Sequence, residues 1–341
     1  MIIDKWLISK DSLEKLFNVL KQDNKKIYAP VGRNGKISFR ETDRFGEIDT
    51  GYIQTAQSSK EVVFPRTEKI LDYNKNKDGV SVKGFDPGSI PEVVLWGVRP
   101  CDAMGIWKLS AIFNWDFKDE IFNTRLSRVT VVGFSCARAD EYCFCTSAGG
   151  GPGNTEGSDI LLTQLGENGD YLAEILTEKG SAIVTIASEL FRENTVLNKE
   201  QFLADVPVRF DREELRVKLE KIFESGCWTK QSLRCLGCGA CAYVCPTCAC
   251  FDIQDEAHGG SGMRVRCWDS CGFSLFTLHT SSHNPREVQS QRWRQRIMHK
   301  FSYMPDRLSV YGCTGCGRCS RACPSDMNML EHLISIQEAE A

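Results

Sequence analysis

The sequence contains no apolar run that approaches the roughly 20 residues a membrane-spanning helix needs. Residues 1–10 lack a basic segment followed by an apolar one, so no secretory signal is expected. The 5 histidines are scattered and never fall at a metal-binding spacing. A net charge of −3 is too small to indicate a nucleic-acid or membrane partner. Together these absences predict a protein of the reducing cytoplasm, where thiols stay free to bind metal.

Cysteine, by contrast, is abundant: the 341 residues include 17, and two runs near the C-terminal end share the spacing C-x-x-C-x-x-C-x-x-x-C-P. In proteins with two [4Fe-4S] clusters, the first three cysteines of such a run bind one cluster and the fourth binds the other. The spacing therefore predicts one cluster on Cys235, Cys238, Cys241 and Cys323, and a second on Cys313, Cys316, Cys319 and Cys245. Zinc knuckles or disulfides fit less well, because structural zinc sites take four ligands as two pairs.

Two apolar runs in the N-terminal half predict neighbouring parallel strands. Residues 92–98 and 128–134 are almost continuously apolar, and a helical segment between them completes a β-α-β unit. Parallel strands end at the same edge of a sheet, so we expect Cys101 and Cys136, which follow these runs, to lie close together. With the next loop they predict a third iron–sulfur cluster on Cys101, Cys136, Cys143 and Cys145. The alternative is that one or two of these thiols are buried packing.

Other segments fill in the predicted fold. Apolar residues at helical spacing predict helices over 10–22 and 212–224. Residues 159–165 and 182–186 are predicted to add strands. The arginine-rich stretch 286–300 is expected to form a solvated helix face or a basic surround for anionic clusters, and not a nucleic-acid site.

A long insert, residues 247–312, separates the two cysteine runs. A compact β-sheet ferredoxin has little room for it, whereas an arrangement in which each run opens a helix accommodates it. Helical candidates at 285–301 and 327–336 favour that arrangement. We therefore predict an α/β domain over residues 1–225, followed over residues 226–341 by an α-helical dicluster ferredoxin-like domain.

The insert also contains four cysteines outside the paired runs: Cys248, Cys250, Cys267 and Cys271. One interpretation is a further metal site, which would be the fourth. The other is that these thiols pack beside the clusters, since free cysteine is among the most buried residue types. Cys227 has no partner at a useful spacing, so a structural role is expected.

Several short motifs, taken together, resemble one family of iron–sulfur subunits. They are Trp96-Gly97-Val98-Arg99-Pro100-Cys101-Asp102, Cys143-Phe144-Cys145-Thr146-Ser147, Cys245-Pro246-Thr247-Cys248-Ala249-Cys250-Phe251-Asp252, Trp268-Asp269-Ser270-Cys271, His283-Asn284-Pro285-Arg286 and Met298-His299-Lys300-Phe301. From about residue 92 to 325 the chain resembles the β subunits of cytoplasmic sulfhydrogenases and the related iron–sulfur subunits of anaerobic sulfite reductases. The resemblance implies a helical two-cluster domain behind an α/β domain. It also implies that the chain relays electrons in a complex with a flavin subunit that exchanges electrons with NAD(P)H. Cys267 departs from the family pattern.

The sequence thus predicts a non-catalytic electron-transfer subunit of a hetero-oligomer. By resemblance, electrons pass between two partners: a flavin-containing NAD(P)H subunit, and a catalytic subunit such as a [NiFe] hydrogenase or a sulfite reductase. An alternative is an enzyme that reduces a substrate at an open iron corner of the N-terminal site, and another is a cluster-bearing regulator. Arg318 and Arg321, inside the second run, are expected to favour the reduced, more negative form of the second cluster.

Overall fold

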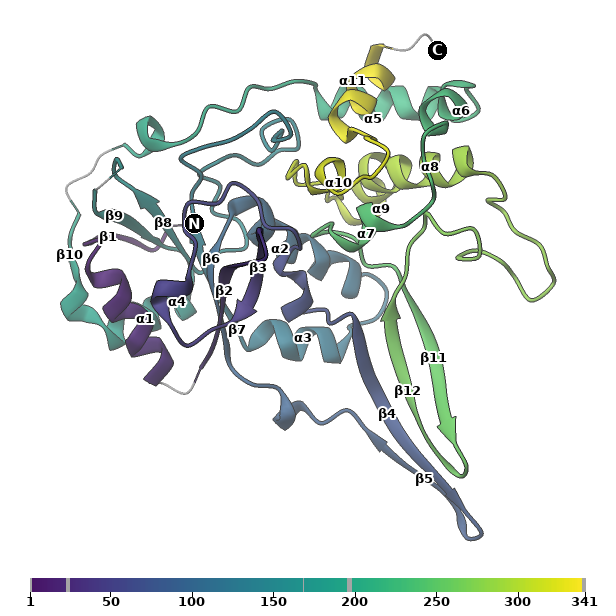
Figure 1. Ribbon diagram of the computed structural model, residues 1–341, viewed down its shortest axis with the longest axis horizontal. Helices are drawn as coiled ribbons and strands as arrows, with labels where there is room; N and C mark the ends of the chain where they lie inside the picture. The colour runs from purple at the N-terminus through teal and green to yellow at the C-terminus, as the bar shows by residue number, and fades with distance from the viewer. Residues whose placement is uncertain (1, 23–24, 168, 195–197, 339–341) are drawn as a thin grey trace.

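The computed structural model describes residues 2–22, 25–167, 169–194 and 198–338. An α/β body forms the N-terminal part, helices gather at the C-terminal end, and two long β-hairpins project from between them (Figure 1). The predicted order of an α/β region followed by a helical region is confirmed. Among the helices of the described residues, none is long and apolar enough to cross a membrane.

The body is built on an eight-stranded mixed sheet with the strand order β10-β1-β9-β8-β7-β6-β2-β3. The neighbours β2, β6, β7 and β8 run parallel, and the remaining pairs are antiparallel. Every residue of β6 and β7 is buried, which explains the apolar runs that predicted them. The strands are β1 (Asp4–Ile8), β2 (Lys26–Arg33), β3 (Lys36–Glu41), β6 (Val93–Val98), β7 (Val129–Phe134), β8 (Ile160–Gln164), β9 (Tyr171–Ile175) and β10 (Phe191–Glu193).

One predicted strand in the body is a helix. Residues 182–186 lie in α4, because Thr177 caps the helix with its hydroxyl, which accepts a hydrogen bond from the Gly180 amide. A short apolar run does not by itself distinguish a strand from a buried helix. The body contains α1 (Ser12–Gln22), α2 (Pro100–Phe113), α3 (Glu120–Ser127) and α4 (Glu178–Ile186), with single 3₁₀ turns at η1 (Phe45–Glu47), η2 (Ser59–Val62), η3 (Pro87–Ser89), η4 (Ser188–Leu190) and η5 (Glu200–Phe202).

The C-terminal helices pack around one apolar cluster that includes Trp293, Ile297, Phe301, Leu330 and Leu333. The helical spacing of these apolar residues explains why helices were predicted in this part of the sequence. The elements are α5 (Arg212–Lys221), α6 (Cys227–Ser232), α7 (Ala240–Tyr243), α8 (Gln289–Met298), a π-helix (His299–Tyr303), α9 (Met304–Leu308), α10 (Arg318–Arg321) and α11 (Met329–Glu338).

The projecting hairpins form a second, four-stranded antiparallel sheet in the order β11-β12-β4-β5. Its strands are β4 (Thr67–Asn76), β5 (Gly79–Gly84), β11 (Phe251–His258) and β12 (Ser261–Trp268). The insert contains the helix predicted over 285–301, but it also contributes a hairpin that was not predicted, and that hairpin pairs with an N-terminal one along β12 and β4. Every residue of β11 is exposed, so the alternation that normally identifies a strand is weak here. The domain division at residue 226 remains a prediction.

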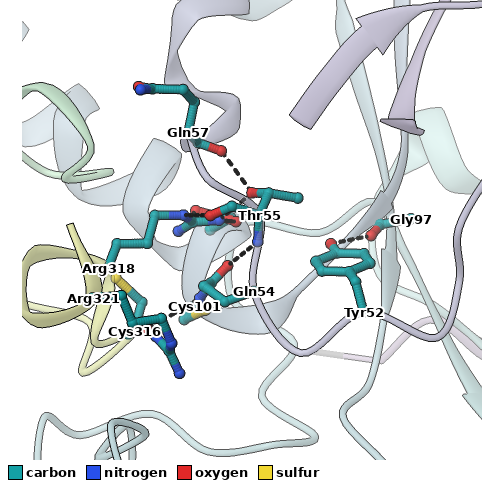
Figure 2. Close-up of polar contacts among 10 residues, drawn as sticks. Tyr52, Gln54, Thr55, Gln57, Gly97, Cys101, Cys316, Arg318 and Arg321 are labelled. Atoms are coloured by element: carbon teal, nitrogen blue, oxygen red, sulfur yellow. Dashed lines mark hydrogen bonds and ion pairs between the residues drawn. The ribbon is translucent and has the colours of Figure 1, made fainter. Parts of the chain in front are cut away.

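A buried ion pair joins the α/β body to the second cysteine run. Arg318 of α10 is 1% exposed and Asp102 of α2 is 0% exposed. The Arg318 guanidinium donates to both carboxylate oxygens of Asp102, over 2.6 Å in the Nη1–Oδ1 contact. It also donates to the carbonyl and the hydroxyl oxygen of Thr55 (Figure 2). Burial raises the pKa of Asp102, and the positive charge of Arg318 opposes that rise.

Asp102→Asn should destabilise the protein by about 3–5 kcal/mol, because it leaves the Arg318 charge buried without a carboxylate. The matched control is Asp255→Asn, which removes a similar aspartate–arginine pair with Arg264 on the exposed hairpin. Anaerobic denaturation, monitored by circular dichroism, should show a clear loss of stability for the first variant and no measurable change for the second. Equal stability of the two variants would contradict the role given to this pair.

Candidate metal centres

The two cysteine runs fold into loops of the same shape. Gly237 and Gly239 have φ angles of 67° and 72°, and the matching residues Gly315 and Gly317 have 64° and 67°. These left-handed values favour glycine, which has no Cβ to clash with the backbone. A four-residue helix follows each loop, α7 in the first run and α10 in the second. The third cysteine of each run lies on that helix, so both loops present three thiols around one turn.

Close contacts also require glycine in these loops. A Cβ on Gly239 would lie 2.5 Å from the Phe273 ring. A Cβ on Gly315 would lie 2.4 Å from the carbonyl carbon of Phe144, whose amide donates a 2.9 Å hydrogen bond to the Gly315 carbonyl. The second run is therefore seated directly against the Cys143–Cys145 loop of the body.

At each of the two predicted paired clusters, cysteines from both runs come together. Cys323, from the second run, lines the same cavity as the first three cysteines of the first run: Cys235, Cys238 and Cys241. Cys245, from the first run, lies within electrostatic range of Cys316 and Cys319, and Cys313 interacts with Cys319. All 17 cysteines are free of disulfides. The crossed arrangement suits two cubane clusters.

The four cysteines assigned to a third cluster line one further cavity: Cys101, Cys136, Cys143 and Cys145. Cys101 lies in the first turn of α2, immediately after β6, and Cys136 follows β7, as the β-α-β unit predicted. Burial raises the pKa of all four thiols, that of Cys145 to about 12. Such thiols stay protonated in the absence of a metal, and metal binding would release their protons.

The third group lies against the second cysteine run. Gln54 joins the two, because its amide nitrogen donates to the Cys101 sulfur over 3.4 Å and to the Cys316 carbonyl over 3.2 Å (Figure 2). Cys316 also lines the cavity that holds the third group. The Gln54 side chain thus connects the second and third cysteine groups. Cys316 does so too, because it is assigned to the second group and lines the cavity of the third.

Buried positive charges surround the cysteines. Lys60, Lys108, Arg296 and Lys300 are each at most 4% exposed, and within the described ranges none forms an ion pair with a carboxylate. A buried charge without a counter-charge is strongly unfavourable. An iron–sulfur cluster with its thiolate ligands is anionic and would supply the missing counter-charge for these cations. Neutral, protonated thiols would not.

Lys300 illustrates the arrangement. Its ammonium donates to the Gly312 carbonyl over 2.7 Å, to the Thr247 hydroxyl over 3.0 Å and to the Cys245 sulfur over 3.4 Å. Burial alone would lower the pKa of Lys300, but negative charge on Cys245 and Cys248 raises it overall. At Lys108, which donates to the Cys313 carbonyl over 2.7 Å, burial dominates and lowers the pKa to about 8.

In the part of the chain that the structure describes, these cations have no carboxylate partner, whereas the two arginines inside the second run each have one. Arg318 is bound to Asp102 and Arg321 is bound to Asp140. Both still act on nearby thiols, since the charge of Arg318 opposes the rise that burial causes in the pKa of Cys316 and Arg321 donates to the Cys143 sulfur. The expectation that Arg318 and Arg321 favour the reduced second cluster stays a prediction, and Lys300 adds a further positive charge at Cys245. One signal for Lys108 was present in the sequence, since it is the one charged residue in the mostly apolar second half of α2.

The four remaining cysteines of the insert do not all come together. Cys250 and Cys271 share a side-chain hydrogen bond, and so do Cys248 and Cys245. Cys267 lies apart on β12, where its thiol faces the Thr67 hydroxyl at 3.8 Å. In the part of the chain that is described, no group of three or more His, Cys, Asp or Glu is set to hold a single metal ion. Cys227 begins α6 and packs against the C-terminal apolar cluster.

Comparison with known proteins agrees with this geometry. A family model described as a 4Fe-4S dicluster domain matches residues 234–327. The chain is 30% identical over 332 residues to sulfhydrogenase 2 subunit beta of Pyrococcus furiosus, a match that covers 95% of this chain and 96% of the relative. No solved structure matches the chain.

Gly315→Ala should lower the iron content by about four atoms per chain, the content of one [4Fe-4S] cluster, because the new methyl group would collide with the Phe144 backbone. The control is Gly259→Ala, at another positive φ of 61° but with no atom within 4 Å. It should keep its iron, since it bears only the local strain of about 1–2 kcal/mol. Iron analysis of anaerobically purified protein tests this, and full occupancy in Gly315→Ala would refute it.

Proposed function

Because the chain belongs to the family of sulfhydrogenase β subunits, we propose that it carries electrons between two partner subunits of one complex, one flavin-containing and one catalytic. It is an iron–sulfur electron-transfer subunit with a [4Fe-4S] dicluster domain. The flavin subunit exchanges electrons with NAD(P)H in this proposal, and the catalytic partner is a hydrogenase or a sulfite reductase. The complex is a hetero-oligomer located in the cytoplasm.

The observation that carries the proposal is the continuity of the cysteine groups. In the crossed assignment the two runs exchange their fourth cysteines, so the first and second groups are neighbours. Cys323 in the first cavity and the interaction of Cys245 with Cys319 support this assignment. Gln54 and the Cys316 carbonyl then connect the second group to the third. Iron–sulfur clusters supply one-electron transfer when bound. Three adjacent groups of four thiols support a relay better than they support an isolated redox site.

We assign Cys235, Cys238, Cys241 and Cys323 to the first cluster, Cys313, Cys316, Cys319 and Cys245 to the second, and Cys101, Cys136, Cys143 and Cys145 to the third. The protein's own contribution is to bury these thiols and to set the charge around them. Lys300 donates to Cys245, and its positive charge favours whichever cluster state is more negative, the reduced one.

The alternative of a substrate-reducing enzyme would require an open iron corner at the N-terminal site. All four cysteines line that cavity, which supports full cysteine ligation. The arginines of α8 also argue against nucleic-acid binding, because several of them are buried or bound within the protein. Arg296 is buried, Arg294 pairs with Glu224, and Arg292 donates to the carbonyls of Arg286 and Glu287.

The test of the relay is to purify the chain both alone and with its native partners. Alone, it should accept electrons from a chemical reductant such as dithionite but show no turnover with NAD(P)H, hydrogen or sulfite. In the complex, NAD(P)H-dependent activity should be present, and both a flavin subunit and a catalytic one should co-purify. Steady turnover by the isolated chain would refute the relay in favour of an enzyme.

Cys101→Ala should remove about four iron atoms per chain relative to the wild type, by loss of a third [4Fe-4S] cluster. Cys227→Ala is the matched control, because its thiol packs against apolar side chains and lines none of the three groups. Both proteins are purified anaerobically and analysed for iron and acid-labile sulfide. The same iron content in the two variants would rule out the third cluster.

A further inference from the structure

Three cysteines lie outside the groups assigned so far, yet they gather at one place beside them. Cys248 and Cys250 follow the first run directly, and Cys271 follows strand β12. The hairpin brings its two ends together, because Phe251 pairs with Trp268 and the Asp269 amide donates a 2.9 Å hydrogen bond to the Cys250 carbonyl. That closure sets Cys250 against Cys271, and their side chains are hydrogen-bonded.

Positive charge converges on the same place from two directions. Arg296 of α8 donates to the Cys248 sulfur over 3.5 Å and to the Cys241 carbonyl over 2.9 Å. Lys60, from the N-terminal half, donates to the Cys248 carbonyl over 2.9 Å and stacks over the Trp268 ring at 3.9 Å. Both side chains are nine-tenths or more buried, and neither has a carboxylate counter-ion among the described residues.

One donor of this group is left unused. The Nε of Arg296 is buried and has no hydrogen-bond partner in the described structure. Arg296 and Cys271 also line the cavity of the first cysteine group, so this donor lies between that group and Cys248. A buried guanidinium that keeps a free donor is costly unless an acceptor is bound nearby. Sulfide and thiolate sulfurs of an iron–sulfur cluster are acceptors of this kind, and their negative charge would offset the cations.

We propose that Cys248, Cys250 and Cys271 are the cysteine ligands of a further iron–sulfur cluster, with Lys60 and Arg296 as its counter-charges. The proposal rests on the relay function and extends it by one site next to the paired clusters. Cys267, which the sequence grouped with these residues, is not a ligand, since it lies on β12 against Thr67. The fourth iron corner is consequently not held by a cysteine of this set.

The experiment compares wild type, Cys250→Ala and Cys271→Ala, with Cys267→Ala as the matched control from the same hairpin. Each full-length protein is purified anaerobically, and iron, zinc and acid-labile sulfide are measured per chain. The first two variants should each lose about four iron atoms and four sulfides, whereas the control should match the wild type. Unchanged iron in Cys250→Ala and Cys271→Ala, or loss of zinc in place of iron, would overturn the proposal.

A second measurement covers the case in which these variants do not fold. Cys101→Ala, which lacks a ligand of the third group only, should retain about twelve iron atoms if the further cluster is present, and about eight would overturn it. Electron paramagnetic resonance of the reduced paired clusters separates this question from the relay itself. Those signals should persist in Cys250→Ala, and their absence from wild-type protein would count against the proposed function instead.

Discussion

The structure depends on buried cations that contact the cysteine segments. Lys60, Lys108, Arg296 and Lys300 are all buried, and none has a carboxylate partner among the residues that the structure describes. Each donates to a sulfur or a carbonyl of a cysteine segment. Carboxylates would offset these charges permanently, whereas thiols do so only when ionised, as they are when they bind iron. An anionic cluster would therefore favour the charged form of these cations, whereas burial alone lowers the pKa of Lys60 and Lys108.

The same contacts make the two halves of the chain one structure. Lys60 and Lys108 belong to the α/β body but contact Cys248 and Cys313 of the C-terminal part. The shared hairpin sheet and the Asp102–Arg318 pair connect the same two parts at other points. These contacts would favour electron transfer between the two parts. Packing fixes the separation of neighbouring cysteine groups, so that separation does not depend on a linker.

Much of this arrangement could be predicted from sequence, because it depends on local spacing. The crossed cysteine runs follow from C-x-x-C-x-x-C-x-x-x-C-P, and the meeting of Cys101 with Cys136 follows from two buried strands. The hairpin of the insert was missed because both of its faces are largely exposed, although Gly259-Gly260 between two extended segments was a usable turn signal. The partners of Arg318, Lys60 and Cys267 could not be predicted, since each lies far away in sequence and leaves no periodic pattern.

The Asp102–Arg318 contact spans most of the polypeptide, and this has a consequence for biosynthesis. A ribosome adding about 5–20 residues per second completes Asp102 roughly ten to forty seconds before Arg318. Early in that interval Asp102, Lys60 and Lys108 have been synthesised, whereas their partners in the C-terminal part have not. The N-terminal half cannot close around them in its final form. The Asp102–Arg318 contact can form only after the last cysteine run emerges, and the paired sites have all their predicted cysteines only at that same stage.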